Sequence, residues 1–320
     1  MKVLITGCAG YVGSVLTNML LKAGHSVTGV DILRFGSAGL LTNIFQDGFT
    51  FHRADICDEK SMQTLIKGQD AVIHLAAIVG DPASKREPEL TRKVNLDATK
   101  RLIKIALGED VSRFIFFSTC SNYGLHESSE YATETSELNP VSLYAETKVA
   151  AEKLLLKNAT NEFSGTVLRC ATVYGFSPRM RFDLTVNHFT RDSFVDKKLL
   201  VYGEQFWRPY IHVYDMAAGA LHVLDAEKSL VQGEVFNTGN TDENYQKRTI
   251  AEIIQKKIPE TTIEYVQVDE DPRNYKVNFS KIRSVLNYET KYTLAQGVDQ
   301  VHDLLNQNII VDPRDPIFAN

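Results

Sequence analysis

Long apolar runs, paired cysteines and an excess of basic residues are all missing from this chain of 320 residues. Because no apolar run approaches membrane-spanning length, the chain is not expected to cross a membrane. A formal net charge of −5 gives no positive field that would attract nucleic acid. The first expected strand begins almost at Met1, which leaves no room for a signal or transit peptide.

Disulfide frameworks and metal sites are also not expected. The four cysteines, Cys8, Cys57, Cys120 and Cys170, are widely scattered and lack the spacing of metal ligands. They are typical of reduced thiols in a cytoplasmic protein. The eight histidines show no paired spacing either, so we predict no metal. Hydrophobic residues make up 43% of the chain, enough to fill a sizeable core.

Strand and helix patterns alternate along the first half of the chain. The expected strands are 2–6, 26–31, 49–53, 70–75, 113–119 and 165–172, and the expected helices are 11–22, 59–67, 89–107 and 143–158. This alternation predicts an α/β fold with a Rossmann-type, doubly wound parallel sheet. Past residue 176 this alternation of strand and helix patterns ends. We therefore expect a dinucleotide-binding domain over 1–175, to which some later segments return, and a smaller α/β substrate-binding subdomain over 176–320.

A glycine loop joins the first strand to the first helix. Gly7, Gly10 and Gly13 are spaced GxxGxxG, and a side chain at such positions would keep the backbone away from a pyrophosphate. The helix that follows would present free N–H groups to the phosphate charge. An ordinary tight turn is the alternative, but the strand, the helix and the next strand all fit a dinucleotide site.

The second strand ends in a carboxylate. Asp31 lies 18 residues beyond Gly13, where an acid accepts hydrogen bonds from the adenosine ribose and repels a 2′-phosphate. NAD is therefore favoured over NADP. Arg34 lies close enough to weaken that preference, although a surface arginine is the commoner explanation.

Tyr144 and Lys148 form a YxxxK pattern at the start of a later helix. Four residues is one helical turn, so the ammonium lies on the same face as the phenol. The cation would favour the phenolate of a tyrosine whose ordinary pKa is near 10, and could also hold the nicotinamide ribose. The pattern arises easily by chance. Its place, after the fifth strand of a dinucleotide fold, is what makes it indicate a general base.

These motifs together make the chain resemble an extended short-chain dehydrogenase/reductase of the NAD-dependent nucleotide-sugar epimerase/dehydratase family. The resemblance covers nearly the whole chain. It is carried by the run from Thr6 to Gly13, Asp31, Asp55-Ile56, His74 to Ala77, Val94-Asn95, Ser118-Thr119, Tyr123-Gly124, Tyr144 with Lys148, and Arg208 to Val213.

The resemblance implies a set of site residues. Tyr144 would be the general base, Lys148 its partner, and Thr119 the hydroxyl that bonds the reacting sugar oxygen. The cofactor NAD would contact Gly7, Gly10, Tyr11, Val12, Gly13, Asp31, Asp55, Ile56, Leu75, Ala76, Ala77, Asn95, Tyr144 and Lys148. The nucleotide-sugar substrate would contact Thr119, Ser121, Arg179, Arg181, Asn187, Arg208 and Arg273. Two further sugar contacts are expected apart from the resemblance: Gly80, in the loop after the fourth strand, and Asn122, which replaces the apolar residue that the family usually has there. For each arginine the alternative is a solvated surface charge. The helices 89–107 and 143–158 resemble those that pair in homodimers of this family.

Departures from the family pattern bear on the reaction. Nucleotide-sugar 4,6-dehydratases carry Thr-Asp-Glu where this chain has Thr119-Cys120-Ser121, so dehydration is not expected. Cys120 is either a proton donor or, more simply, a small buried thiol. A 4-epimerase is the favoured activity, and a 4-dehydrogenase or 4-ketoreductase acting on a deoxy or heptose sugar is the alternative. A non-catalytic NAD-binding sensor is a third reading, which retention of both Tyr144 and Lys148 opposes.

Overall fold

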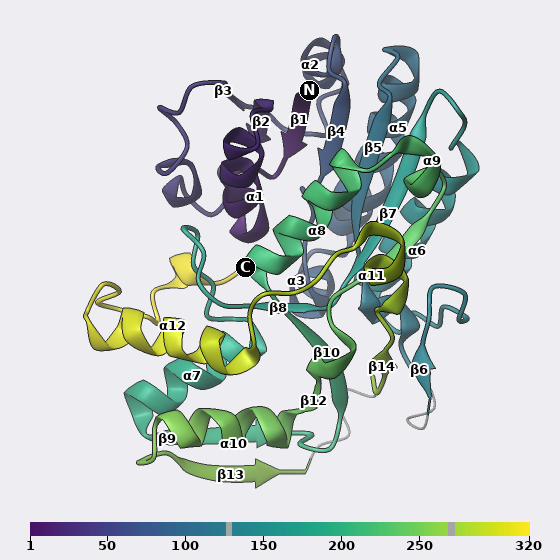
Figure 1. Ribbon diagram of the computed structural model, residues 1–320. Coiled ribbons are helices and arrows are strands. Elements are labelled where there is room, and N and C mark those ends of the chain that lie inside the picture. The colour runs from purple at the N-terminus through teal and green to yellow at the C-terminus, as the bar shows by residue number, and fades with distance from the viewer. Residues whose placement is uncertain (126–129, 268–272) are drawn as a thin grey trace.

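The computed structural model describes residues 1–125, 130–267 and 273–320 (Figure 1). The strands are β1 (Lys2–Thr6), β2 (Ser26–Asp31), β3 (Phe49–Arg53), β4 (Ala71–His74), β5 (Arg113–Thr119), β6 (Tyr131–Ala132), β7 (Ser164–Cys170), β8 (Thr172–Tyr174), β9 (Lys198–Tyr202), β10 (Trp207–His212), β11 (Val235–Thr238), β12 (Asn244–Gln246), β13 (Thr262–Val266) and β14 (Lys276–Val277). The α-helices are α1 (Tyr11–Lys22), α2 (Glu59–Ile66), α3 (Asp81–Arg86), α4 (Pro88–Arg92), α5 (Thr99–Gly108), α6 (Leu143–Lys157), α7 (Thr185–Asp196), α8 (Val213–Asp225), α9 (Lys228–Val231), α10 (Lys247–Lys257), α11 (Ser280–Leu286) and α12 (Leu294–Asn306). A π-helical turn (Lys93–Ala98) joins α4 to α5, and short 3₁₀ helices lie at Ala38–Leu40, Cys120–Tyr123, Thr241–Glu243 and Pro316–Phe318.

A seven-stranded sheet with the order β11-β7-β5-β4-β1-β2-β3 forms the centre of the molecule, and its neighbouring strands are all parallel. Successive side chains of a strand point to opposite faces, so a parallel strand covered on both faces is apolar throughout. Val3 and Ile5 accordingly join one core cluster and Leu4 joins the other. The strand order confirms the predicted Rossmann-type, doubly wound fold.

Helices cover both faces of this sheet. Figure 1 shows α1 and α8 in front of it, with α5 and α6 behind. The first core cluster packs apolar residues of α1 and α8 against the sheet, and the second packs those of α2, α5 and α6. Both α8 and β11 come from the chain after residue 175, so the two parts of the chain interleave.

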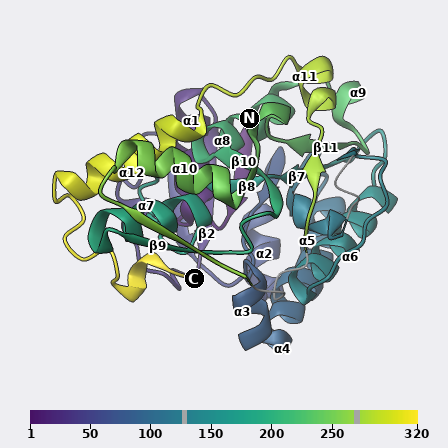
Figure 2. The same ribbon diagram turned by 90° about the horizontal axis from the view of Figure 1, so that it is seen from below.

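Those remaining segments form the lower part of Figure 1. They contain a three-stranded sheet ordered β12-β10-β8 and a β13-β9 pair, over a third apolar cluster that includes residues of α7, α10 and α12. Seen from below, α7, α10 and α12 lie on one side of the molecule and α5 and α6 on the other (Figure 2).

Most predicted elements are found within one or two residues of their expected ends. The expected strand 165–172 is wrong in one respect, because β7 ends at Cys170 and a separate strand, β8, begins at Thr172. β7 pairs with β5 and β11, whereas β8 pairs with β10 in the smaller sheet. A single apolar run thus continues from the central sheet into the smaller sheet. The hydrophobic pattern alone does not show where the chain changes sheets.

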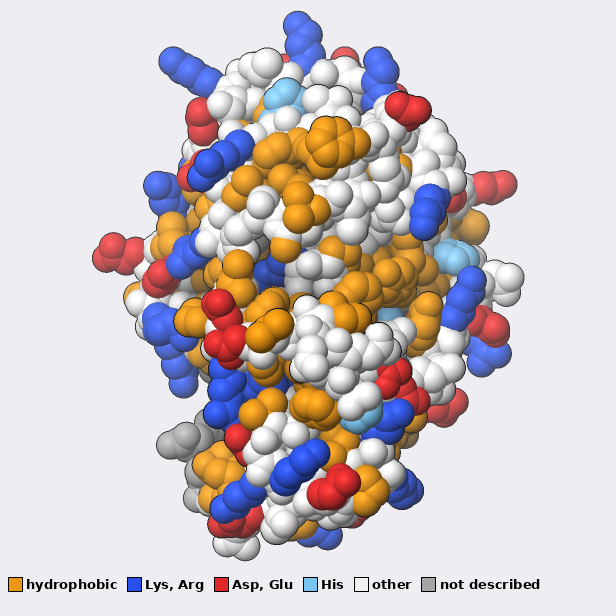
Figure 3. Space-filling view, turned by 90° about the vertical axis from the view of Figure 1, so that its left-hand side faces the viewer, with side chains coloured by type: hydrophobic (Ala, Val, Ile, Leu, Met, Phe, Trp, Pro, Cys, Tyr) orange, Lys and Arg blue, Asp and Glu red, His pale blue; other side chains and the backbone are white. Residues whose placement is uncertain are grey.

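Charged side chains of both signs are intermixed on the face shown in Figure 3, and apolar side chains gather across its middle. Within the described ranges, no helix is both long enough and apolar enough to span a bilayer.

Candidate active site

The glycine loop between β1 and α1 has almost no room for side chains. Gly7 has a φ of 77°, and a Cβ there would lie 2.9 Å from the Ala76 backbone nitrogen. A Cβ on Gly13 would lie only 2.0 Å from the Gly7 carbonyl oxygen. The N-cap, Gly10, offers no side-chain hydrogen bond, and the first turn of α1 holds no acidic residue. This helix N-terminus therefore fits the diphosphate of a dinucleotide.

Asp31, at the end of β2, is held in place by backbone groups. Its carboxylate accepts hydrogen bonds from the N–H of Ala9 at 3.1 Å and of Leu33 at 2.7 Å. Burial raises the pKa of Asp31, and these two hydrogen bonds act against that rise. Arg34 forms an ion pair with Glu87 at 2.7 Å, so its charge already has an acidic partner. The placement of Asp31 fits the ribose of an adenosine, as the sequence predicts.

Tyr144 and Lys148 lie on the first two turns of α6, as their spacing predicts. The helix begins cleanly because the Ser142 hydroxyl accepts a hydrogen bond from the Ala145 N–H at 3.2 Å. The Lys148 Nζ lies 6.0 Å from the centre of the Tyr144 ring and donates to the Phe117 carbonyl at 2.8 Å. Because Phe117 is in β5, this bond connects α6 to the strand that ends in Thr119.

Burial dominates the electrostatics of this pair. It raises the pKa of the Tyr144 phenol above its ordinary value of 10 and lowers the pKa of Lys148 from 10.5 to about 8. The expectation that Lys148 favours the phenolate is thus opposed, in the protein by itself, by desolvation of the phenol. A further positive charge beside the Tyr144 ring is needed to lower the pKa of its phenol toward neutral pH.

The effect on thermal stability of replacing Lys148 with methionine is expected to be most favourable at neutral pH. The pKa of Lys148 is lower in the folded protein than in the unfolded chain, so the unfolded chain holds this proton more tightly. The buried charge therefore costs stability, at most about 3 kcal/mol, below about pH 8, and this cost disappears as the pH rises toward 10.5. The gain in Tm of Lys148→Met over the unsubstituted protein should shrink between about pH 7 and about pH 10. A difference in Tm between the two proteins that does not change with pH contradicts a lowered pKa of Lys148.

A cavity of about 420 Å³ brings most of the predicted residues together at the ends of the parallel strands. The predicted residues that line it are Gly7, Gly10, Tyr11, Val12, Gly13, Asp31, Asp55, Ile56, Leu75, Ala76, Ala77, Thr119, Ser121, Tyr144, Lys148, Arg179 and Arg181. Both the loop expected to hold the cofactor and the residues expected to react thus face the same space. Its length runs from Asp31 and Asp55, after β2 and β3, to Tyr144 on α6.

Three predicted residues with amide side chains stand behind the cavity wall. The Asn95 side chain accepts from the Ile78 N–H at 2.8 Å and donates to the Ile78 carbonyl at 2.9 Å, which fixes a residue that does line the cavity. The Asn122 amide donates to Glu152 at 2.6 Å and to the Ser118 hydroxyl at 3.1 Å. Asn187 accepts from the Gly175 N–H at 2.9 Å and donates to the Arg181 carbonyl at 2.9 Å. None of these three residues lines the cavity, and each amide nitrogen donates to internal partners, whereas the Asn122 Oδ1 is buried without a partner among the described residues.

Gly80, Arg208 and Arg273 also lie outside the lining. Arg208 donates to the Trp207 carbonyl at 2.7 Å and to the Arg273 carbonyl, and its guanidinium lies 5.1 Å from the Tyr275 ring centre. Arg273 forms an ion pair with Asp81 at 2.8 Å. Tyr275 itself lines the cavity. Arg208 thus lies behind a residue of the cavity wall, and contact of either arginine with a substrate stays a prediction.

The sequence interpretation missed a buried polar network beneath the reacting groups. Arg169 and Glu152 form an ion pair at 2.9 Å, with side chains only 6% and 1% exposed. Glu152 also accepts from the hydroxyl of Ser118, the residue before Thr119. Since Glu152 follows Lys148 by four residues, helical spacing could have placed it on the same face. The network connects α6 to the end of β5, so both elements that carry reacting groups are held together.

Comparison with known proteins gives a family for this architecture. The model described as "NAD dependent epimerase/dehydratase family" matches residues 3–239. An uncharacterized UDP-glucose epimerase of Bacillus subtilis (strain 168), YtcB, is 28% identical over 311 residues, which are 93% of this chain and 96% of that protein. The dTDP-glucose 4,6-dehydratase of Actinoplanes sp. is 29% identical over 312 residues, 93% and 95% of the two chains. The UDP-glucuronic acid 4-epimerase of Bacillus cereus, solved with UDP-glucuronic acid and NAD, superposes with a TM-score of 0.86 at 27% identity, over 96% of this chain and 99% of that one.

Proposed function

The chain belongs to the NAD-dependent epimerase/dehydratase family, and from that membership we propose that it is a nucleotide-sugar 4-epimerase. Within this family it is an NAD-dependent enzyme with a Rossmann-type fold. The observation that carries the proposal is that Thr119, Tyr144 and Lys148 line one cavity together with the glycine loop. That combination suits the oxidation and re-reduction of an alcohol carbon beside a nicotinamide ring.

The residues of the cavity fit NAD. The crowded glycine loop and the N-terminus of α1 would hold its diphosphate, Asp31 its adenosine ribose, and Lys148 its nicotinamide ribose. When bound, NAD supplies an acceptor for a hydride and later its donor, together with the positive charge that Tyr144 needs.

In the proposed reaction Tyr144 moves one proton in each direction. Its Oη takes the proton of the C4 hydroxyl while the hydride leaves C4, and the Thr119 hydroxyl bonds the same sugar oxygen. The resulting 4-keto sugar turns over in the cavity. The hydride then returns to the opposite face of C4, and Tyr144 gives the proton back to the oxygen. No net oxidation occurs, since the proton and the hydride are both returned.

The acidic residues of the cavity argue against dehydration. Among the described residues, the acidic residues that line the cavity are Asp31 at the end of β2, Asp55 after β3, and Glu87 beside Arg34. Next to Thr119 the loop offers Cys120, which is buried and donates to the Arg169 carbonyl at 3.2 Å. Burial raises the pKa of this thiol well above its usual range. The dehydratase relative therefore shares the family, while the residues that follow Thr119 in this chain, Cys120 and Ser121, supply no carboxylate for the loss of water.

The same residues also suit a 4-dehydrogenase or a 4-ketoreductase, in which the cycle stops halfway. A non-catalytic NAD sensor is opposed by the joint placement of Thr119, Tyr144 and Lys148 in the cavity. A homodimer and a cytoplasmic location remain expectations from the sequence.

We assign a UDP-hexose or UDP-hexuronate as the substrate class, because relatives of 27% and 28% identity are named for UDP-glucuronic acid and UDP-glucose. The test is incubation of the full chain and NAD with UDP-glucose and with UDP-glucuronate, followed by chromatography and mass spectrometry. A product of unchanged mass at a new elution position supports the epimerase. If neither sugar is altered, the assigned substrate class is wrong.

A further inference from the structure

Arg179 lies at the end of the cavity opposite the reacting groups. The sequence interpretation placed it with the substrate. Its guanidinium, however, lies 4.6 Å from the centre of the Phe35 ring, and Phe35 follows Asp31 in the loop after β2. All three residues line the cavity. Arg179 thus faces the part of the cavity that fits the adenosine half of NAD, although it comes from the chain after the central sheet strand β7.

The guanidinium of Arg179 is buried and incompletely bonded. The residue is 4% exposed, and one terminal nitrogen donates to the Ala319 carbonyl at 3.1 Å. Its Nε has no hydrogen-bond partner among the described residues. Burial lowers the pKa of Arg179 only to about 10, so the group is charged at neutral pH. The carboxylates of Asp183 and Asp31 favour this charge, but the Nε–H still lacks the hydrogen-bond acceptor that a buried donor needs.

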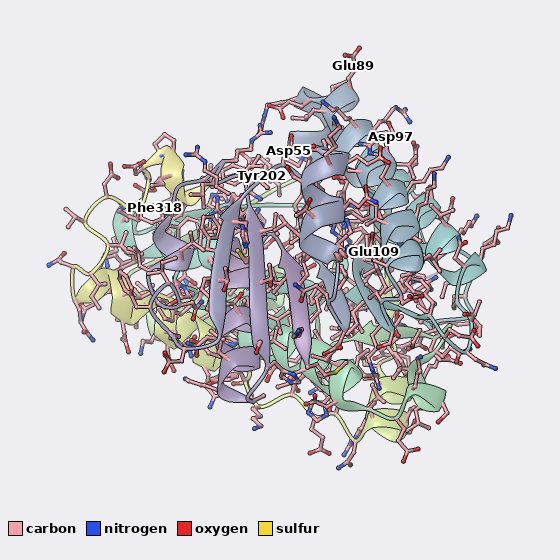
Figure 4. The ribbon with its side chains drawn as sticks, turned by 90° about the horizontal axis from the view of Figure 1, so that it is seen from above. Asp55, Glu89, Asp97, Glu109, Tyr202 and Phe318 are labelled. Carbon is pink, nitrogen blue, oxygen red and sulfur yellow. The ribbon has the colours of Figure 1, made fainter. Side chains whose placement is uncertain are left out.

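The C-terminal residues 318–320 hold Arg179 in this position. Phe318 accepts a hydrogen bond from the Phe182 N–H at 2.8 Å, and their rings meet edge to face with centres 5.7 Å apart. The Asn320 N–H donates to Asp183 at 3.2 Å, and Arg86 donates to the Asn320 carbonyl at 3.0 Å. Figure 4 labels Phe318 in the C-terminal turn and Asp55 at the strand ends, and in Figure 1 the C-terminus lies below α1 in the middle of the molecule. The segment therefore reaches the cavity, where Asn320 forms part of the lining.

We propose that Arg179 is a cofactor-binding residue that clamps the adenosine diphosphate half of NAD against the glycine loop. A guanidinium presents a fork of N–H donors that matches phosphate oxygens, and that of Arg179 already lies over the Phe35 ring. The backbone of residues 319 and 320 supplies the support behind it. The cofactor is then held from both sides, by the first β–α loop and by the segment after β8. This assignment rests on NAD dependence and not on the 4-epimerase activity.

The test is calorimetry on the full chain with NAD, ADP, nicotinamide mononucleotide and UDP. For Arg179→Met we expect the Kd of NAD and of ADP to rise by the same factor of about 10 to 100, the value of one charge-assisted hydrogen bond. The Kd of nicotinamide mononucleotide and of UDP should not change. Arg179→Lys keeps the charge without the fork and should give an intermediate rise.

Two controls make the result decisive. Arg191 on α7 pairs with the neighbouring Asp192 at 2.7 Å and does not line the cavity, so Arg191→Met should leave every Kd unchanged. Thermal unfolding of each variant separates loss of binding from loss of the fold. If the Kd of UDP rises while the Kd values of NAD and ADP stay unchanged, Arg179 contacts the substrate and the proposal is wrong. Unchanged affinity for all four ligands in a folded Arg179→Met protein overturns the proposal as well.

Discussion

Replacing Tyr144 with phenylalanine is expected to lower kcat about 10³-fold and to leave the Kd for NAD nearly unchanged. The substitution removes only the hydroxyl, which the proposed reaction uses to take and return the C4 proton. The ring is 8% exposed and remains packed in the cavity wall, so the volume of the site changes little. Initial rates with the UDP-sugar that the enzyme converts, together with calorimetry of NAD binding, measure both quantities.

Tyr131 provides a matched control for this substitution. It lies in the short strand β6 with 41% of its surface exposed, outside the cavity lining. Tyr131→Phe should therefore keep full activity. If Tyr144→Phe turns over at a rate close to the unsubstituted enzyme, the proton acceptor is a different group and the assignment of Tyr144 fails.

Replacing Gly13 with alanine is expected to have the largest effect on cofactor binding, a rise in Kd for NAD of at least about 100-fold. The added Cβ would lie 2.0 Å from the Gly7 carbonyl oxygen and 2.9 Å from the Gly7 carbonyl carbon. These are backbone atoms, so the loop and the start of α1 must move apart. Because the proposed diphosphate site consists of this loop and this helix N-terminus, we expect the movement to remove the site.

Gly108, at the end of α5, is the control for the glycine substitution. A Cβ there meets nothing within 4 Å, so Gly108→Ala should bind NAD normally and unfold at the same or a slightly higher temperature. Circular dichroism on Gly13→Ala shows whether the rest of the protein stays folded. Unchanged NAD affinity in folded Gly13→Ala would show that the dinucleotide does not use this loop.

Local patterns predicted the parts of the site that adjacent residues build. The glycine loop, the carboxylate after β2 and the Tyr144–Lys148 pair each depend on a single turn or strand end, so their spacing contains the necessary geometry. The alternation of strands and helices predicted the sheet for the same reason. In the structure the three loop glycines, the carboxylate and the tyrosine–lysine pair all line the cavity: Gly7, Gly10, Gly13, Asp31, Tyr144 and Lys148.

Residue spacing did not predict the orientation of a polar side chain, or which residues from distant parts of the chain contact it. Asn122 was expected to reach the sugar, but Glu152 on α6 occupies its amide. The prediction that Arg179 contacts the substrate did not foresee its neighbours Phe35 and Ala319, which come from distant parts of the sequence. Tyr275 and Asn320 line the cavity through tertiary packing, and no local motif marks them.

The most direct test of the 4-epimerase assignment follows the hydride itself. The enzyme would be incubated with NAD and a UDP-sugar that carries deuterium at C4, while NADH is monitored by absorbance. An epimerase returns the hydride, so the product should have the inverted C4 configuration, the same mass and the deuterium still at C4, without accumulation of NADH. A product that has lost the deuterium while NADH accumulates contradicts the 4-epimerase and identifies a 4-dehydrogenase. Loss of water or of carbon dioxide contradicts it equally.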